Sequence, residues 1–294
     1  MNKKVFITGS GGFVGKNLYK LAKESAFDVY GVDLSKKPCV DEIVDIADEI
    51  KLRCVLDKTK PSFIVHVAAL SNVEKCEIER DLAYKNNVLP VKILTEWAKE
   101  NDATMLFISS DYVYDGGRGK FTEDDQALPV QYYGLTKLQG EDIVSKLKKH
   151  IILRPTVIYG WDLDGMNFFM QLFRKQKDKQ EMKVPVDQIN NPTFVNDLCE
   201  LIVKILKTPD KYGIFVSTGP ESMNRYEFGL QLCDSMGWDK ELLKPVQTLE
   251  FGQLAKRPLN NSTSSEKVCR MFNFDFNDLK TNLEIIKNQI ENNL

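Results

Sequence analysis

Three side chains in the middle of the sequence have the types and spacing needed for proton transfer. Tyr133 and Lys137 are four residues apart, so on a helix they lie on the same face. A phenol titrates near pH 10 and is a poor acid or base at neutral pH, with a reference pKa of about 10. A neighbouring ammonium group lowers that pKa, so we expect Lys137 to make Tyr133 a usable general acid or base. Ser110, at the end of an apolar run, could hydrogen-bond the same reacting oxygen.

The tyrosine–lysine spacing by itself carries little information, because Tyr19 and Lys23 repeat it. We expect that second pair to lie on the outer face of the first helix. Tyr133 and Lys137 differ because a serine-rich strand end precedes them and a glycine-rich loop opens the chain. In a parallel sheet these features meet at one edge.

The glycine-rich loop predicts a site for a dinucleotide. Residues 8–15 read Thr-Gly-Ser-Gly-Gly-Phe-Val-Gly and follow a short apolar run. Gly9 allows a sharp turn, Gly12 lets the backbone approach a phosphate, and Gly15 lets the next helix pack closely on the strand. The N-terminus of that helix then presents free N–H groups to the anion.

An acidic residue, Asp33, closes the next apolar strand at nearly the spacing expected of a ribose-binding carboxylate. The alternative interpretation is a plain glycine turn followed by a helix-capping aspartate. A carboxylate at this point hydrogen-bonds a free 2′-hydroxyl and repels a 2′-phosphate, which favours NAD(H) over NADP(H). Lys36 and Lys37 follow directly and could offset that repulsion, so both cofactors stay open.

Apolar runs alternate with amphipathic segments in the first half of the chain. The predicted strands are 5–8, 29–32, 63–67, 105–108 and 151–153. The predicted helices are 16–24, 46–59, 81–100 and 132–148. Continuous apolar strands separated by helices predict an α/β fold with a doubly wound parallel sheet, the Rossmann architecture. Such a sheet binds its ligands at the carboxyl ends of the strands.

The pattern becomes less regular beyond about residue 160. We predict a loop over 160–165, helices over 167–177, 194–206, 225–236 and 279–289, and a last strand over 214–217. We expect residues 1–160 to form a dinucleotide-binding domain, to which 192–217 return. Residues 161–191 and 218–294 would then form a smaller α/β substrate-binding domain.

The composition excludes several other classes of protein. Of 294 residues, 43% are hydrophobic, which is enough for a full core, and 40 basic against 42 acidic residues leave no excess positive charge for nucleic acid or membranes. The apolar run at the start is too short for a signal peptide, and no segment reaches the length of a membrane span. Six scattered cysteines predict reduced thiols in the cytoplasm, and two distant histidines argue against a metal site.

Taken together, these motifs resemble those of the extended short-chain dehydrogenases/reductases. Within that group the chain is most similar to the dTDP-4-dehydrorhamnose reductase family of sugar-nucleotide reductases, and the resemblance covers nearly the whole chain. The segments that carry it are Thr8–Gly15, Val65–Ala69, Asn87-Val88, Ser109–Gly116, Tyr133–Lys137 with Gly140-Glu141, Arg154-Pro155, Asp187-Gln188, Pro192-Thr193 and Arg257–Asn260.

The resemblance implies a catalytic trio of Ser110, Tyr133 and Lys137, with Lys137 also holding the nicotinamide ribose. Asn87 would support a proton-relay water, or would be an ordinary polar residue of its helix. The implied cofactor contacts are Gly9, Gly12, Phe13, Val14, Gly15, Asp33, Asp45, Ile46, Ala68, Ala69, Leu70, Tyr133, Lys137 and Pro155. Asp45 could instead cap the helix that follows it.

The resemblance also implies a substrate side of the site, with no metal. Its expected residues are Ser110, Asp111, Tyr112, Val157, Asn167 and Arg257. Arg257 would bind the phosphates or the sugar of the substrate, because a guanidinium binds phosphate bidentately; the alternative is a surface arginine. We expect His66 to be a packed strand residue.

Two details narrow the implied chemistry. Sugar-nucleotide 4,6-dehydratases of this superfamily carry Thr-Asp-Glu where this chain has Ser110-Asp111-Tyr112, and tyrosine cannot replace their elimination acid. The rhamnose reductases typically carry a tryptophan where this chain has Val157, which leaves the identity of the sugar open. Trp161 could take over that role.

The leading hypothesis is an NAD(P)H-dependent reductase of a nucleotide-linked 4-keto-6-deoxy sugar, with hydride delivered to C4 and Tyr133 as proton donor. A sugar-nucleotide epimerase that retains NAD⁺ is a second hypothesis. A third is a cofactor-binding regulatory subunit, because the regulatory subunit of methionine adenosyltransferase resembles the same family. The expected partner is a nucleotide sugar, and a homodimer is compatible with the superfamily.

Overall fold

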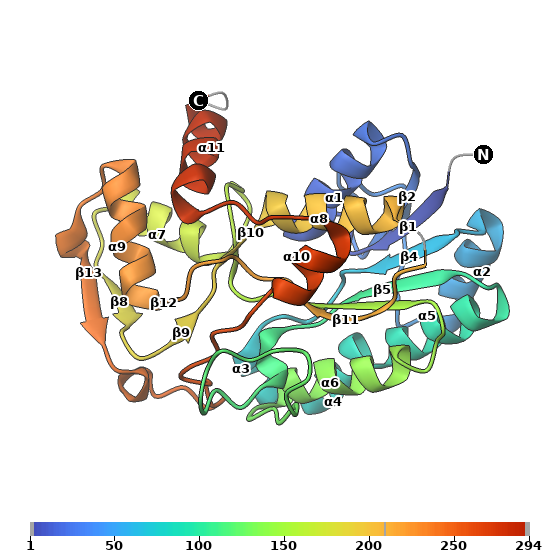
Figure 1. Cartoon of the computed structure of the whole chain (residues 1–294), viewed down its shortest axis with the longest axis horizontal. Helices are drawn as coiled ribbons and strands as arrows, with labels where there is room; N and C mark the ends of the chain where they lie inside the picture. Colours follow the sequence, from blue (N-terminus) through green and yellow to red (C-terminus); the bar gives the residue numbers. More distant parts are fainter. Residues whose placement is uncertain (1–2, 209, 292–294) are drawn as a thin grey trace.

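The computed structural model describes residues 3–208 and 210–291 and builds them around a seven-stranded parallel sheet (Figure 1). The strand order is β11-β6-β5-β4-β1-β2-β3. The strands are β1 (Lys4–Thr8), β2 (Asp28–Asp33), β3 (Glu42–Ile43), β4 (Phe63–His66), β5 (Thr104–Ile108), β6 (His150–Arg154) and β11 (Gly213–Val216). Because the order runs outward from β1 in both directions, the predicted doubly wound parallel sheet is confirmed.

Each central strand is buried on both of its faces, as its continuous apolar sequence predicts. All five residues of β5 are buried. In β1, Val5 and Ile7 belong to one apolar cluster while Phe6 belongs to another. Successive side chains of a strand point to opposite faces, so one apolar cluster covers each face of the sheet.

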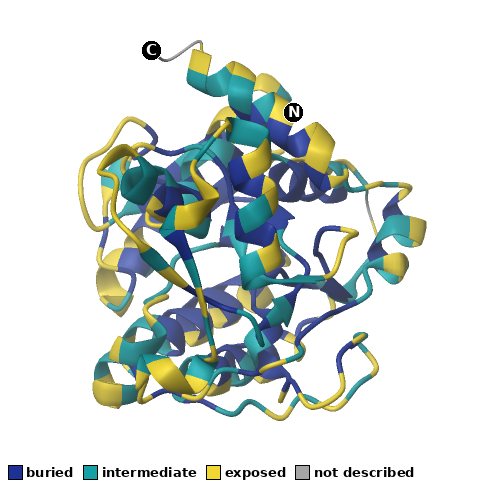
Figure 2. Ribbon diagram, turned by 90° about the vertical axis from the view of Figure 1, so that its left-hand side faces the viewer, coloured by how far each residue is buried: buried dark blue, intermediate teal, exposed yellow. Residues whose placement is uncertain are grey.

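Helices cover both faces of the sheet (Figure 1). One cluster is completed by α1 (Phe13–Glu24) and α8 (Val195–Lys207), which also contact each other. The other is completed by α2 (Glu49–Thr59), α5 (Leu89–Glu100) and α6 (Tyr132–Val144). Figure 2 shows the result, with buried residues in the centre and exposed ones on the outer surfaces of the helices.

Most of the remaining elements lie beyond one end of the sheet, whereas α10 (Glu266–Phe272) packs against β11 and α8 (Figure 1). Three two-stranded pairs occur in the described residues, namely β7 (Ile158–Tyr159) with β10 (Thr193–Phe194), β9 (Ile189–Asn190) with β12 (Met223–Asn224), and β8 (Met182–Pro185) with β13 (Leu243–Val246). The helices among these elements are α7 (Phe168–Lys177), α9 (Arg225–Met236), α10 and α11 (Leu279–Glu291). The prediction that 214–217 would be the last strand is therefore wrong. Strands this short leave no periodic pattern in the sequence.

The single helix predicted over 81–100 is also wrong, because two helices replace it. They are α4 (Arg80–Asn87) and α5, with Val88 between them. Pro90 lies in the first turn of α5, where its missing N–H group costs nothing, and so starts a new helix. A further short helix, α3 (Val73–Ile78), was not predicted.

The expectation for Tyr19 is wrong as well. Its side chain is only 6% exposed and belongs to the core, and its hydroxyl donates to Asp41 Oδ2 over 3.0 Å. Lys23 is exposed, with its ammonium 4.4 Å from the centre of the Tyr19 ring. The pair thus joins the helix to the loop after β2 and does not form an outer face.

The helices of the described residues are too short or too polar to cross a membrane.

Candidate active site

A cavity of about 850 Å³ lies at the carboxyl ends of the central strands. Its wall includes Gly9 after β1, Asp33 at the end of β2, Ala68 after β4, Ser110 after β5 and Pro155 after β6. Five separate strand ends thus contribute to one hollow. This is the edge at which doubly wound sheets bind ligands.

The glycine loop gives this cavity an anion site made of backbone. Gly9 has a φ of +67°, and a Cβ on Gly15 would lie 2.0 Å from the carbonyl oxygen of Gly9. Gly12 is the N-cap residue of α1, with no side chain capping the helix and no acidic residue in its first turn. Gly12, Phe13 and Val14 line the cavity. An uncapped helix N-terminus that faces a cavity suits the diphosphate of a dinucleotide.

Asp33 is held beside this loop by backbone N–H groups. Its Oδ2 accepts from Gly11 N over 3.0 Å and its Oδ1 from Leu34 N over 2.7 Å. Lys37 donates to the Gly11 carbonyl over 3.2 Å and also lines the cavity. No helix begins after Asp33 before α2, so the helix-capping interpretation of this residue is wrong in the described chain.

Asp45 and Ile46 line the cavity beyond Asp33. Asp45 Oδ1 accepts from Ala47 N over 3.0 Å, whereas Asp48 caps α2 by accepting from Lys51 N. The suggestion that Asp45 caps the following helix is therefore wrong. Both residues remain free to line a cofactor site.

The loop after β4 brings Ala68, Ala69 and Leu70 to the cavity, with Asn87 supporting it. Asn87 is buried; its Oδ1 accepts from Leu70 N over 2.7 Å, and its Nδ2 lies 3.2 Å from Leu70 O and 3.1 Å from Thr136 Oγ1. These bonds hold the loop against α6. In this geometry Asn87 holds Leu70, a residue of the cavity wall, in place.

His66 is packed within β4, as expected. Its Nδ1 lies 2.7 Å from Thr8 Oγ1, and its ring stacks with Phe107. Burial lowers the pKa of His66 to about 3, so the ring is neutral at physiological pH.

The structure brings Ser110, Tyr133 and Lys137 to the same cavity. Ser110 Oγ donates to Asp111 Oδ1 over 3.0 Å and accepts from Tyr112 N over 3.2 Å. Tyr133 and Lys137 face the cavity from α6, near its N-terminus. Lys137 is 2% exposed, and its ammonium lies 4.5 Å from the centre of the Phe107 ring.

The electrostatics of the trio differ from the sequence-based expectation. Burial raises the pKa of Tyr133 above its usual value, and the nearby Asp111 carboxylate raises it further. Burial also lowers the pKa of Lys137 to about 7, with Glu141 acting in the opposite direction. The prediction that the Tyr133 pKa is lowered is therefore wrong for this structure, because burial and the Asp111 carboxylate raise it. Tyr133 therefore keeps its proton at neutral pH.

A buried ion pair stands behind the trio. Arg154 Nε donates to Glu141 Oε1 over 2.9 Å and Nη2 to Oε2 over 2.5 Å, while Ser109 Oγ donates to the same Oε1 over 2.5 Å. Arg154 Nη1 also donates to Tyr114 Oη over 2.8 Å. These bonds join the end of β5, α6 and β6, which fixes Ser110 relative to Tyr133. The sequence named Glu141 and Arg154 only as parts of the resemblance.

On the substrate side, Asp111 is buried among amides. It is 2% exposed; Asn261 Nδ2 lies 3.0 Å from its Oδ2, and Asn190 Nδ2 lies 3.4 Å from the same atom. Burial raises the pKa of Asp111 above its usual value, and hydrogen bonds from Asn261 and Ser110 oppose that shift. Sequence reasoning missed Asn190 and Asn261, since neither belongs to a motif with a chemical interpretation.

Tyr112, Val157 and Asn167 also line the cavity, as expected. Tyr112 meets the Tyr133 ring edge to face, with centroids 6.1 Å apart. Val157 has a φ of +43°, a region that a β-branched residue rarely enters. Asn167 caps α7, and its Nδ2 donates to Gly160 O over 3.1 Å.

Four of the expected residues lie outside the described cavity wall, namely Gly15, Asn87, Arg257 and Trp161. Arg257 Nη2 donates to Glu74 Oε1 over 2.9 Å and Nη1 to Ala255 O over 3.0 Å. With a side chain only 10% exposed, Arg257 is not an ordinary surface arginine either. Trp161 packs edge to face against Phe173 at 5.1 Å and does not take the place of the missing tryptophan.

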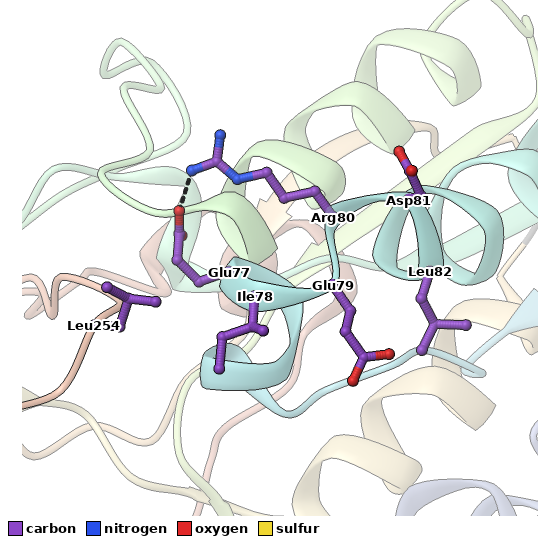
Figure 3. Close-up of a pocket in the computed structure, with 7 residues that line it drawn as sticks. All are labelled: Glu77, Ile78, Glu79, Arg80, Asp81, Leu82 and Leu254. Carbon is purple, nitrogen blue, oxygen red and sulfur yellow. Dashed lines mark hydrogen bonds and ion pairs between the residues drawn. The ribbon is translucent and has the colours of Figure 1, made fainter.

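A second hollow, of about 670 Å³, lies on the outer surface at the junction of α3 and α4 (Figure 3). Its wall contains Glu77–Leu82 and Leu254, with Arg80 paired to Glu77. None of the expected site residues lines it. The chemistry-bearing side chains therefore gather in the larger cavity.

Known proteins share this architecture. A family model described as "RmlD substrate binding domain" matches residues 3–291. The dTDP-4-dehydrorhamnose reductase of Aggregatibacter actinomycetemcomitans is 31% identical over 97% of this chain and 98% of its own. Methionine adenosyltransferase 2 subunit beta of Xenopus laevis is 28% identical over 92% of this chain and 83% of its own. The structure of dTDP-4-dehydrorhamnose reductase from Bacillus anthracis, solved with NADP, covers 98% of this chain and 100% of its own, at 30% identity and a TM-score of 0.90.

Proposed function

Because the chain belongs to the RmlD substrate-binding domain family, we propose that it is an NAD(P)H-dependent reductase of a nucleotide-linked 4-keto-6-deoxy sugar. One observation carries the proposal. Ser110, Tyr133 and Lys137 line the same cavity as the uncapped N-terminus of α1. A dinucleotide held by that helix end would extend along the strand ends toward the trio.

The residues of the chain would divide the work of one reduction. A bound nicotinamide supplies the hydride for C4 of the sugar. Tyr133, which keeps its proton at neutral pH, donates it to the oxygen on C4, while Ser110 orients that oxygen by a hydrogen bond. Lys137 binds the ribose hydroxyls and stabilises the phenolate that proton transfer leaves on Tyr133.

The remaining expected residues would hold the cofactor. Gly9, Gly12, Phe13, Val14 and Gly15 would form the diphosphate site, and Asp33 would bind the ribose. Asp45 and Ile46, which line the cavity, would contact the adenine, and Ala68, Ala69, Leu70 and Pro155 would flank the path to the nicotinamide. Asn87 keeps Leu70 in place.

The choice between NADH and NADPH depends on two side chains at the adenosine end. Asp33 favours a free 2′-hydroxyl, whereas the neighbouring Lys37 would attract a 2′-phosphate. The Bacillus anthracis relative was solved with NADP. Paired affinity measurements for NADH and NADPH test this choice. Asp33→Ala should improve NADPH binding relative to NADH, and an unchanged ratio would remove Asp33 from the selection.

The experiment that tests the activity follows the absorbance of the reduced cofactor. Purified protein is mixed with NADH or NADPH and a panel of nucleotide-linked 4-keto-6-deoxy sugars. We expect oxidation with at least one sugar, and none across the panel would contradict the proposal. Protein that is purified already loaded with NAD⁺ and isomerises a sugar without consuming cofactor would instead be an epimerase.

A non-catalytic role is the second candidate, because a methionine adenosyltransferase subunit is 28% identical over most of the chain. Such a protein would bind the cofactor and co-purify with a synthetase, yet turn over no sugar. The fully assembled trio favours the enzyme. Pull-down from the source cells beside the activity panel separates the two roles.

Location and assembly belong to the proposal as well. All six cysteines are free in the structure, which supports the expected cytoplasmic location. We keep residues 1–160 with 192–217 as the cofactor-binding part, and 161–191 with 218–294 as the substrate-binding part. Residues 1–2, 209 and 292–294 of these ranges lie outside the described chain. A homodimer is tested by light scattering.

A further inference from the structure

An arginine that no motif indicated lies on the substrate side of the cavity. Arg225 is the first residue of α9 and lines the cavity together with Asp111 and Asn167. The helix starts there because Asn224 and Glu227 form a capping box, which fixes the backbone of Arg225 at the rim. The position of this guanidinium is thus set by a regular structural element.

Arg225 differs from the other arginines near the site because it forms no ion pair within the described residues, although the Asp111 carboxylate lies near enough to interact with it electrostatically. Arg154 is paired with Glu141 and Arg257 with Glu74. Within residues 3–208 and 210–291, the side chain of Arg225 makes one long hydrogen bond, of 3.4 Å, to Asn190 Oδ1. Its guanidinium also stacks at 5.1 Å on the ring of Phe168. A guanidinium keeps its charge in proteins, so this one is free to bind an anion.

The anion that fits is part of the substrate and not of the cofactor. The cationic side chains on the described cavity wall are Lys37, Lys137 and Arg225. Lys37 lies at the glycine loop, and Lys137 belongs to the catalytic trio. Arg225 is therefore the cation of the described wall that remains for a ligand other than the cofactor.

A chain of contacts places Arg225 just beyond the reacting group. Ser110 contacts Asp111, Asp111 contacts Asn190, and Asn190 contacts Arg225. A sugar whose C4 oxygen lies at Ser110 and Tyr133 would therefore direct its other end toward the guanidinium. In a nucleotide sugar that other end carries the diphosphate.

We propose that Arg225 forms the diphosphate subsite of this cavity. The proposal rests on the nucleotide-linked substrate proposed above. The planar guanidinium donates two parallel hydrogen bonds to phosphate oxygens, with Phe168 supporting its face. A carboxylate on an acidic sugar would present the same chemistry, so the test separates the two sources.

The test measures binding without turnover. The full-length protein is titrated calorimetrically with dTDP, thymidine and glucuronate, as wild type and as Arg225→Gln, Arg225→Lys and Arg270→Gln. Arg270 is exposed on α10 and serves as a charge-matched control. Arg225→Gln should weaken dTDP about 10- to 100-fold and leave thymidine unchanged. The dTDP affinity of Arg225→Lys should lie between those of wild type and Arg225→Gln, because lysine keeps the charge and loses the bidentate geometry.

Three outcomes would overturn the proposal. The first is equal affinity of wild type and Arg225→Gln for dTDP. The second is that Arg225→Gln loses as much affinity for thymidine as for dTDP. The third is that Arg225→Gln loses affinity for glucuronate alone, which would assign Arg225 to a sugar carboxylate. The melting temperature and NADPH affinity of each variant report whether the fold survives. Because dTDP binding needs no reaction, failure of the sugar panel would leave this test valid, and the two proposals fail separately.

Discussion

The two walls of the cavity are built in opposite ways. The wall that we propose for the cofactor is centred on the glycine loop, where Gly12 to Val14 present the backbone of the uncapped N-terminus of α1 to the cavity. The wall on the proposed substrate side consists of side chains from distant segments, such as Asp111, Asn167 and Arg225. A wall of backbone needs small residues in a fixed order, whereas a wall of side chains needs only that the fold bring them together.

The largest effect should come from the residue at which the two walls meet. Tyr133→Phe should lower kcat by about 10²- to 10⁴-fold, because the proton donor is lost. The affinities for cofactor and for dTDP should both stay at their wild-type values in direct titrations. Tyr84→Phe is the matched control, since its hydroxyl bonds only to Lys92 among the described contacts, at the surface. Full activity of Tyr133→Phe would exclude it as the donor.

The next effect concerns the buried ion pair between Glu141 and Arg154, which stands behind the trio. Glu141→Gln leaves Arg154 buried without an opposite charge, so the free energy of unfolding should fall by about 3–5 kcal/mol. Urea denaturation measures this loss. The double variant Glu141→Leu with Arg154→Leu should lose less, because it buries no unpaired charge. If the double variant were less stable than Glu141→Gln, the cost of Glu141→Gln could not be assigned to the unpaired charge of Arg154.

A smaller loss of stability, at Gly15, should tell whether cofactor affinity and dTDP affinity can be changed independently. A methyl group at Gly15 would clash with the carbonyl of Gly9, so Gly15→Ala should cost about 1–3 kcal/mol of stability. Cofactor affinity should fall as the loop shifts, and dTDP affinity should not change. Gly117→Ala is the control, because its new Cβ would have its nearest contact at 3.4 Å. If dTDP affinity fell along with that for NADPH, the two walls would not be independent.

The last effect, the smallest when it is counted per pH unit, is a pH dependence at Lys137. Its folded-state pKa of about 7 is below the usual lysine value, so between pH 7 and 10 the unfolded chain binds more protons. Wild type should then gain roughly 1 kcal/mol per pH unit relative to Lys137→Met over that range. Below pH 7 the difference should stay constant. Parallel urea titrations measure it, with Lys146→Met, at an exposed position, as control. A difference that does not change with pH would mean that Lys137 stays charged.

The contrast between the walls also explains which predictions failed. The sheet and most helices could be predicted because apolar periodicity is local, but Pro90 divided one predicted helix and the two-residue strands left no pattern. Burial of Tyr19 depends on its contact with Asp41, a loop residue. The Tyr133 pKa depends on how much protein surrounds the phenol, which spacing cannot reveal.

By itself the sequence indicated which strand ends line the cavity, because the glycine loop and the strand-end acid depend on their immediate backbone neighbours. Only the tertiary structure decided the substrate wall. It paired Arg257 with Glu74, whereas Arg225 contacts Asn190 and forms no ion pair in the described part of the chain. Two arginines are identical as letters, and what separates them is the set of charges that the folded chain brings within hydrogen-bonding distance.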